Sequence, residues 1–393
     1  MSGKVISEPS PSEISELFAD SRTVIEIIGP GGAGKTTLAR QIGQWSLMGG
    51  RPSGVPGHAM IPIWIDEDMT SETNPLDRVV KGKLAALLPE EKLEQAFLEA
   101  LFKKQRLLIV LDRLSERSGT TLHYIATVYR SLRPEALLIT ARMPLNIEGA
   151  TPVILYPQSL NQETLLHFMT SLLKLGTGEP DTPSTVSLDD QLALGKKLAD
   201  LYRTATHADG SGTRILPLPV RLFVEEAKNN IRAGRPLDLP LSVPGVYLRY
   251  LEQVNPQEPT SRNFMTHAEM LRAATVLAKL ALGRDFIPKE FDAASAAAAL
   301  RDAGWDNPQL LDPLQRLVDN GILIEKDPLI SRHLRFALDP IADNLAAAAY
   351  VREAAKDAIQ LTDLRAKAAK APGFLNAIDL VSRPDDAPDP LHS

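Results

Sequence analysis

The sequence of 393 residues predicts an α/β domain with a parallel sheet flanked by helices, followed by a helical domain and a winged-helix domain. The first domain is predicted by short aliphatic runs that alternate with segments of helical spacing, and by a glycine-rich turn between the first run and the first helix. The winged helix is predicted by helices that lead into two short apolar runs with the pattern of a hairpin.

Composition limits the class of protein. Hydrophobic residues make up 44% of the chain and charged residues 23%, which is ordinary for a protein with well-filled cores. The absence of cysteine excludes disulfides, thiolate catalysis and Cys-based zinc sites, and it suits a reducing compartment. A net charge of −6 argues against general nucleic-acid binding. With no signal-peptide pattern in residues 1–20 and no apolar run of membrane-spanning length, we expect a soluble cytoplasmic protein without a membrane partner.

The segment VIEIIGPGGAGKTTLAR, residues 24–40, joins a β-branched strand to a helix through a glycine-rich turn. The turn fits the pattern G-x-x-x-x-G-K-[ST] without a mismatch. Such a loop surrounds phosphate with backbone N–H groups, and the helix N-terminus adds a favourable dipole. We therefore expect ATP or ADP as the bound cofactor, held by Gly29, Pro30, Gly31, Gly32, Ala33, Gly34, Lys35, Thr36 and Thr37.

The second signal is the buried-strand run Leu107–Leu111, which is followed directly by Asp112. An acid at the carboxyl end of a parallel strand lies where a doubly wound sheet places its ligand chemistry. Asp112 is expected to hold Mg²⁺, partly through water, together with the Thr36 hydroxyl, while Lys35 reaches the β- and γ-phosphates. Glu116 is placed to orient the attacking water. The alternatives are structural: Asp112 would cap the following loop, and Glu116 would be a solvated surface acid.

Further elements of this domain follow in order. Residues 61–66 read as a strand near a sheet edge, because Pro62 has no N–H to donate. The run 137–142 reads as another core strand, and Arg142 at its end is a candidate sensor of the γ-phosphate or else a surface arginine paired with an acid. The other expected elements are helices at 76–88, 91–104 and 120–132 and a short strand at 153–156.

A resemblance to a known class is carried by the P-loop and by the segments LLIVLDRLSE, LLITAR and VILYPQSLNQETLLHFM, in that order. This order resembles the STAND class of signalling ATPases, nearer to the NACHT and NB-ARC domains of NLR-type proteins than to motor ATPases. In NACHT proteins the Walker B aspartate, to which Asp112 corresponds here, is usually followed by a small residue, Leu, Asp and Glu. Here Arg113 and Ser115 differ and Glu116 matches, so the resemblance implies a slow ATPase in which Asp112, Glu116 and Arg142 act.

Two more segments bear on the resemblance. Residues 215–222, ILPLPVRL, resemble the Gly-Leu-Pro-Leu-Ala motif of NB-ARC proteins, whose proline lies against the nucleotide; Pro219 is the best match and Pro217 the second. A proline that merely starts a helix fits both. NLR proteins carry a Met-His-Asp triplet where this chain has ALD, residues 337–339. Because Leu338 cannot donate a hydrogen bond, we expect phosphate sensing there to be weaker or to come from elsewhere.

The expected domain boundaries complete the organisation. They are a lead-in at 1–20, a P-loop domain at 21–156, a helical lid domain at 157–255, a winged helix at 256–355, and a helical extension with an acidic, proline-rich tail at 356–393. Within these segments we also expect a short strand at 286–288 and one alanine-rich helix from Ile341 past Ala371.

Three functions are weighed. The leading hypothesis is a nucleotide switch, closed with ADP and open with ATP, that forms homo-oligomers in the ATP state and serves in signalling, either prokaryotic defence against phage or transcriptional regulation. Its trigger and effector are unknown and could lie in parts of a longer chain. An AAA-type ATPase that loads or remodels DNA is the alternative, and a metabolic kinase fits poorly. Acids outnumber bases across 284–343, whereas a DNA-recognition helix is expected to be basic, so we expect a protein partner and not DNA.

Overall fold

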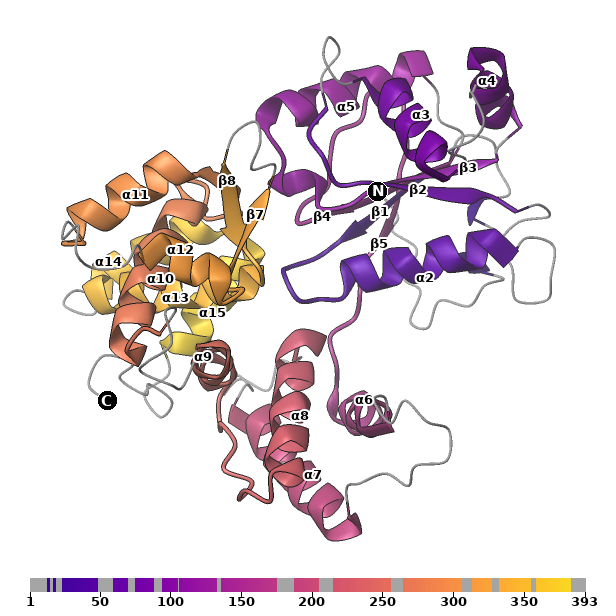
Figure 1. Cartoon of the computed structure of the whole chain (residues 1–393). Helices are drawn as coiled ribbons and strands as arrows, with labels where there is room; N and C mark the ends of the chain where they lie inside the picture. Colours follow the sequence, from indigo (N-terminus) through magenta and orange to yellow (C-terminus); the bar gives the residue numbers. More distant parts are fainter. Residues whose placement is uncertain are drawn as a thin grey trace. The chain divides into compact units, whose positions relative to one another are not determined.

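The computed structural model describes residues 13–14, 17–18, 23–48, 59–69, 75–87, 94–104, 106–132, 136–174, 187–204, 215–255, 264–305, 313–326, 332–354 and 358–382. The chain divides into two compact units (Figure 1). The first unit takes in 1–30 and 34–158, and the second takes in 159–393 together with the short stretch 31–33.

The first unit is built on a five-stranded sheet in the order β2-β3-β4-β1-β5, with every pairing parallel. The predicted edge position of Pro62 is confirmed, because β2 lies at the end of this order. The inner strands β1, β3 and β4 are buried along their whole length, which explains their unbroken apolar runs. The strands are β1 (Thr23–Ile28), β2 (Ile61–Ile65), β3 (Leu107–Leu111), β4 (Ala136–Ala141) and β5 (Val153–Leu155).

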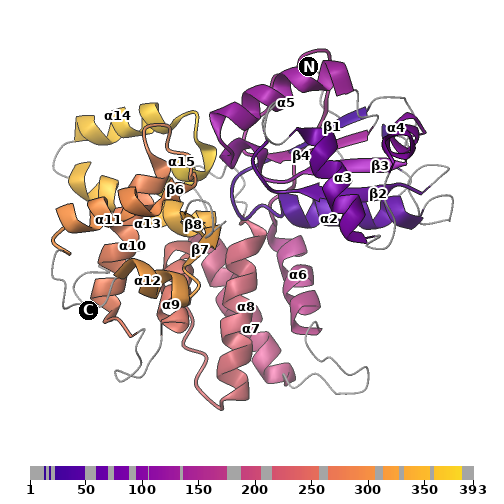
Figure 2. The ribbon, with the colours of Figure 1, turned by 45° about the horizontal axis from the view of Figure 1, so that its top comes forward.

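Helices cover both faces of this sheet, with α2 on one face and α3 and α5 on the other (Figures 1 and 2). Alternation along β1 divides its side chains between the two layers. Ile25 and Ile27 join the core of α2 with Ile42, whereas Val24 and Ile28 join the opposite core. The helices are α2 (Lys35–Met48), α3 (Leu76–Leu87), α4 (Gln95–Lys103) and α5 (Gly119–Leu132), with a 3₁₀ turn η1 (Leu114–Glu116) after β3.

The second unit begins with a helical part and continues into a winged helix. A capping box formed by Thr266 and Glu269 starts α10, the first helix of the winged helix. The small sheet has the order β6-β8-β7 and is antiparallel. The elements are α6 (Gln162–Lys174), α7 (Leu188–Thr204), α8 (Pro217–Arg232) and α9 (Val243–Val254), then α10 (His267–Leu282), β6 (Phe291–Asp292), α11 (Ala293–Asp302), α12 (Pro313–Asp319), β7 (Leu323–Lys326) and β8 (His333–Phe336).

The α/β P-loop NTPase fold with helical and winged-helix parts is therefore confirmed, but two predicted elements are wrong. The first strand of the winged helix is at 291–292 and not at 286–288, because Phe286 has a left-handed φ of 55° and its ring stacks on Phe374. The single long helix is three helices: α13 (Asp339–Ala354), α14 (Ala358–Ala368) and α15 (Pro372–Val381). Pro372 cannot continue α14, and it starts α15 instead.

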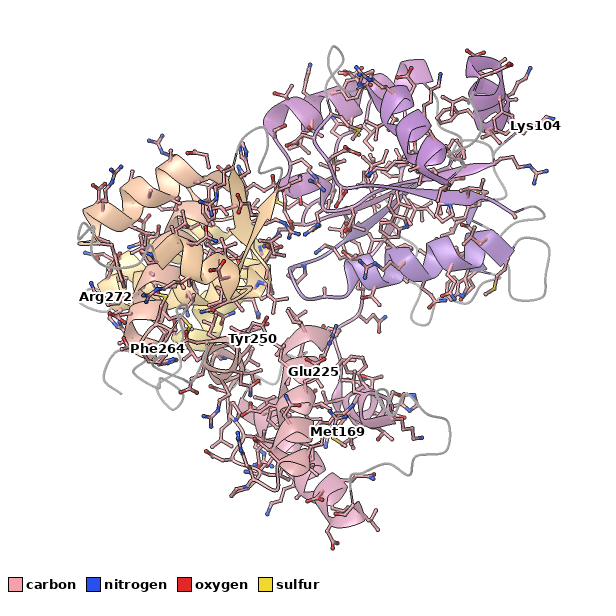
Figure 3. The ribbon with its side chains drawn as sticks, in the orientation of Figure 1. Lys104, Met169, Glu225, Tyr250, Phe264 and Arg272 are labelled. Atoms are coloured by element: carbon pink, nitrogen blue, oxygen red, sulfur yellow. The ribbon has the colours of Figure 1, made fainter. Side chains whose placement is uncertain are left out.

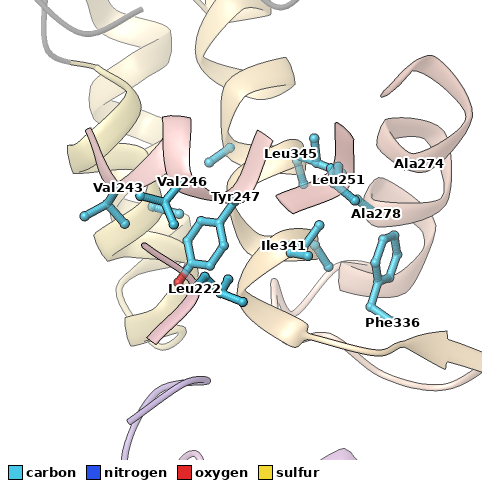
Figure 4. Packing of buried hydrophobic residues seen from close by; sticks show 14 of the residues in the cluster. Leu222, Val243, Val246, Tyr247, Leu251, Ala274, Ala278, Phe336, Ile341 and Leu345 are labelled. Carbon is cyan, nitrogen blue, oxygen red and sulfur yellow. The ribbon is translucent and has the colours of Figure 1, made fainter. Parts of the chain in front are cut away.

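One continuous hydrophobic cluster joins the helices of the second unit. Side chains of α9, α10 and α13 meet in it, among them Tyr247, Ala278 and Ile341 (Figure 4). Within the described residues, no helix has the length and apolar character needed to cross a membrane. The acidic, proline-rich tail from 383 lies outside the described residues, as do residues 176–186, 207–212 and 327–328.

Candidate nucleotide-binding site

The phosphate-binding loop connects β1 to α2, and its backbone needs glycine at two positions. Gly32 and Gly34 have left-handed φ angles of 77° and 88°. The amide N–H of Gly29 donates to the Ala141 carbonyl at 3.2 Å, which ties the start of the loop to the end of β4. The sequence pattern and the backbone thus agree on a loop shaped for phosphate.

Lys35 opens α2, and its side chain turns back over the loop. Its Nζ donates to the carbonyl oxygens of Gly29 and Pro30, each at 2.8 Å, and the residue is buried. A buried ammonium group needs such acceptors. These contacts hold the charge of Lys35 at the loop, where phosphate oxygens are the natural competing acceptors.

A buried hydrogen-bond network at Asp112 joins the P-loop helix to two strands. Asp112 Oδ1 accepts from Thr36 Oγ1 at 2.9 Å and from Thr140 Oγ1 at 2.6 Å. Thr140 is a candidate site residue that the sequence did not single out, although a hydroxyl within the apolar run of β4 is itself a signal, since a buried hydroxyl needs a partner. The network brings Thr36 and Asp112 together as expected of two groups that hold one metal ion.

The donor set fits Mg²⁺ and not a closed protein-only metal site. Among the described residues there is no group of three or more His, Cys, Asp or Glu side chains that could hold a metal. Thr36 and Asp112 supply only hydroxyl and carboxylate oxygens, which are the hard ligands that Mg²⁺ prefers. Mg²⁺ usually completes its shell with water and substrate phosphates, so two protein groups suffice.

Glu116 and Arg142 form a largely buried ion pair. Arg142 Nε lies 3.3 Å from Glu116 Oε1, and their side chains are 3% and 11% exposed. The backbone N–H of Arg142 donates to Ser115 Oγ at 2.9 Å, so the same two segments are joined twice. Neither residue is a solvated surface group; each is the partner of the other.

Arg113, directly after Asp112, has a strained backbone. Its φ of 55° is left-handed, which is uncommon for a residue with a side chain. Its N–H donates to Thr140 Oγ1 at 2.7 Å, and its Nε lies 3.7 Å from Asp112 Oδ2. Such strain persists where the surrounding contacts over-determine it, and it clusters at functional sites.

The second unit holds the other candidate residues. There the N–H of Leu218, at the start of α8, donates to the Gly32 carbonyl at 3.3 Å, and a Cβ on Gly32 would lie 3.3 Å from the Pro340 ring. Pro219, the residue expected to lie against the nucleotide, follows Leu218 in α8 and is buried. The described contact between the segment 215–222 and Gly32 is made by Leu218. Asp339 is the first residue of α13.

One buried acid went unnoticed in the sequence. Glu26 lies in the middle of β1 and is fully buried; its Oε2 accepts from the N–H of Leu145 at 3.2 Å. Burial raises the pKa of Glu26, and the hydrogen bond from Leu145 opposes that rise. Glu26 thus fixes the loop that follows Arg142. Its signal in the sequence was a charge inside an aliphatic run.

No protein-family model matches the sequence. No curated protein matches it either. Among solved structures it is similar to Cdc6p from Pyrobaculum aerophilum, with 15% identity over 84% of this chain and 88% of that chain and a TM-score of 0.34. It is also similar to a STAND protein with a tetratricopeptide repeat sensor from Pyrococcus horikoshii (15% identity, 96% of this chain, 52% of that chain, TM-score 0.33) and to Drosophila ORC bound to DNA (12%, 85%, 82%, 0.27). Scores of this size carry no weight for function; the P-loop NTPase fold rests on the parallel sheet, its strand order and the phosphate-binding loop.

Proposed function

We propose that this chain is a STAND-type switch, related to NACHT and NB-ARC domains, that binds ATP with Mg²⁺, hydrolyses it slowly and self-associates while ATP is bound. The observation that carries the proposal is the buried polar arrangement at the carboxyl edge of the sheet. There Asp112 joins Thr36 to Thr140, and Glu116 pairs with Arg142. An acid for the metal and an acid for water on neighbouring segments are the parts that a P-loop ATPase needs.

The roles of the residues follow from their chemistry. Thr36 and Asp112 would hold Mg²⁺, which when bound neutralises phosphate charge. Lys35 exchanges the carbonyls of Gly29 and Pro30 for phosphate oxygens. Glu116 orients a water molecule and accepts its proton as ATP and water become ADP and phosphate. Arg142 stabilises charge on the γ-phosphate.

Slow turnover is proposed because Glu116 acts without a second acid. The neighbouring position holds Ser115, whose hydroxyl accepts a hydrogen bond from the backbone of Arg142. In the described arrangement Arg142 also pairs with Glu116. This pairing holds the Glu116 carboxylate in place until Arg142 pairs with another anion. A long-lived ATP state is what a switch requires.

Coupling of nucleotide to conformation is supported by the contacts of Gly32. Its carbonyl accepts from Leu218, and its Cα lies so close to Leu218 and Pro340 that a Cβ would meet both. A ligand shifts a conformational equilibrium only through differential contacts with its states. We propose that phosphate in the loop changes these contacts, with Pro219 beside them. The output would be signalling, in defence against phage or in transcriptional regulation.

An AAA-type ATPase that loads DNA is the alternative, and the charges of the winged helix favour a protein partner. Arg316, the basic residue of α12, donates to the Phe264 carbonyl (Figure 3 labels Phe264). Arg332 pairs with Glu325 at 2.8 Å, and Lys326 with Glu290 at 3.2 Å. Because these cations already face acceptors of the protein, they offer little to a phosphate backbone.

The deciding experiment identifies the nucleotide and the size of the particle. Mass spectrometry of nucleotide released from the purified protein should find ADP, and light scattering should show larger species with ATP and Mg²⁺ than with ADP. In parallel, fluorescence anisotropy with duplex DNA at physiological salt should show at most weak, sequence-independent binding. Tight DNA binding with a steep salt dependence, and one particle size in both nucleotides, would establish the alternative instead.

A further inference from the structure

We propose that the second unit contains a binding site for a small amphipathic acid, in a cavity of about 590 Å³ bounded by α9, α10 and α13. The ligand class is a molecule with an apolar body, one carboxylate and a hydroxyl or amide N–H. The cavity shares no residue with the nucleotide machinery, so the proposal is independent of the proposed function. Its volume lies in the range of small-molecule sites.

The cavity exists because small side chains stand where larger ones would fill the space. On α13 the lining includes Ala348 and Ala349, which are half-buried, and α10 presents Thr275 and Val276. The inner wall is apolar, with Tyr247 on α9 among its residues. Leu251, Ile341 and Leu345 also line it, and Figure 4 labels them with Tyr247 in the hydrophobic cluster. Apolar walls of this kind favour an apolar ligand body.

A cation and an N–H donor meet at one side of the cavity. The guanidinium of Arg272 lies over the ring of Trp305, 5.6 Å from its centroid, and both residues line the cavity. The Trp305 indole N–H is buried and has no acceptor among the residues that the structure describes. Arg272 itself is exposed and lies at the surface of the second unit (Figure 3). A carboxylate in the cavity can accept from the exposed guanidinium of Arg272, and charge-assisted bonds of this kind are the strong ones.

The charges of the lining favour an anion. Arg272, Lys279 and Arg352 face the cavity with a single acid, Glu353, which pairs with Lys279 at 2.7 Å. Among the side chains that line the cavity, cations therefore outnumber acids three to one. The lining therefore selects anions over cations.

Asn344 adds a specific polar contact. Its Nδ2 donates to the Pro340 carbonyl at 2.8 Å, which fixes the orientation of the amide because a carbonyl can only accept. Its Oδ1 is buried, and among the described residues it has no donor. Since an unmet buried acceptor is costly, a hydroxyl or amide N–H on the ligand is favoured there.

The test uses N-dodecanoylglycine, which has an acyl chain, an amide N–H and a carboxylate, and its uncharged methyl ester. Calorimetry with the full chain below the micelle concentration should give one saturable site for the acid and at least tenfold weaker binding of the ester. Arg272→Glu should weaken binding of the acid tenfold or more, whereas Arg284→Glu, the same change at an exposed arginine outside the cavity, should alter it less than twofold.

A second pair of variants tests the location. Ala348→Phe fills the cavity and should abolish binding, whereas Ala294→Phe adds the same ring to the exposed side of α11 and should not. Absence of saturable binding, or equal effects of the members of either pair in folded protein, would overturn the proposal. Sedimentation with phosphatidylglycerol vesicles separates a free acid from a membrane acyl chain; we expect no co-sedimentation, and its occurrence would overturn the assignment to a free acid.

Discussion

In the first unit several buried polar side chains meet at one edge of the sheet, whereas in the second unit a buried acid lies where two helices pack on one another. Asp112, Thr140 and Arg142 all stand at the carboxyl ends of β3 and β4 and bond to groups of other segments. In the second unit, Glu226 of α8 faces Arg249 of α9, with 3.1 Å between Oε1 and Nε. The first arrangement brings groups of several segments together at the proposed ligand site, and the second joins two helices.

The difference shows that burial of charge is not by itself a sign of function. Both units hide acids, and in both the acid has a cationic partner. What distinguishes the edge of the sheet is convergence: a lysine, two threonines, two acids and an arginine come from the P-loop and two neighbouring strands. Changes at the sheet edge should therefore alter ligand chemistry, and changes at the helix pair should alter stability.

The largest effect is expected at Glu116. Glu116→Gln keeps the size and polarity of the side chain but removes the charge that orients and deprotonates water, so ATP should still bind while turnover falls about a hundredfold or more. The ATP state then persists, and larger species should accumulate with ATP and Mg²⁺. Single-turnover hydrolysis beside light scattering measures both. The control is Glu67→Gln, which removes a half-buried acid of the same unit; hydrolysis by Glu116→Gln at the parent rate would assign the catalytic role elsewhere.

Loss of the P-loop cation should come next. Lys35→Ala removes a charge whose hydrogen bonds are worth about 1.5–3 kcal/mol each, so nucleotide affinity should fall from tenfold to more than a hundredfold. Calorimetry with ATP and Mg²⁺ gives the dissociation constant. Lys83→Ala, at a half-buried lysine paired with Glu67 in the same unit, should leave it unchanged. An unaltered constant in Lys35→Ala would refute the assignment of the loop.

The sequence predicted much of the first unit because its signals are local. The run before Asp112 and the spacing of Gly34, Lys35 and Thr36 predict the strand, the loop and two candidate metal-binding groups without knowledge of distant contacts. Thr140 was missed because its role depends on a bond to Asp112, 28 positions away. The Arg142–Glu116 pair has no signal in the sequence for the same reason. The two residues follow different strands, and only the register of the sheet brings them together.

The second unit was harder because its breaks depend on tertiary packing. An alanine-rich stretch reads as one helix, yet Pro372 starts a new helix that returns Phe374 to the core. The left-handed Phe286 also has no sequence signal, because its backbone is supported by aromatic contacts with Tyr350 and Phe374. Helical propensity is a weak prior that such packing overrides.

The dependence of stability on pH should distinguish the Glu226–Arg249 pair from the groups at the edge of the sheet. Burial raises the pKa of Glu226 to about 7 despite the opposing effect of Arg249, with Asp238 and Glu252 adding to the rise. A raised folded-state pKa gives stability that is complete below the unfolded value and is lost as pH rises through about 7. From pH 5 to 8.5 the free energy of unfolding should therefore fall by about 2–3 kcal/mol through this group.

Urea unfolding at the two pH values checks this fall. Glu226→Gln, which resembles the protonated acid, should remove most of the dependence on pH. Its exposed neighbour gives the matched control, since Glu225→Gln lies on the same helix (Figure 3) and should retain the dependence. Equal pH dependence in Glu226→Gln and the parent would place the titrating group elsewhere.

The smallest effect compares two glycines of one loop, Gly34 of the first unit and Gly32 of the second. Both have left-handed φ angles, so alanine at either position should cost about 1 kcal/mol of stability. At Gly34 a Cβ would meet nothing within 4 Å, whereas at Gly32 it would lie 3.0 Å from Leu218 Cβ and 3.3 Å from the Pro340 ring. Urea unfolding without nucleotide should therefore show a larger loss for Gly32→Ala than for Gly34→Ala, by roughly 1 kcal/mol, which is the low end of the cost of overpacking. Equal losses would mean that Leu218 and Pro340 move away from a Cβ on Gly32 at little cost in free energy. The proposed coupling through Gly32 would then lose its support.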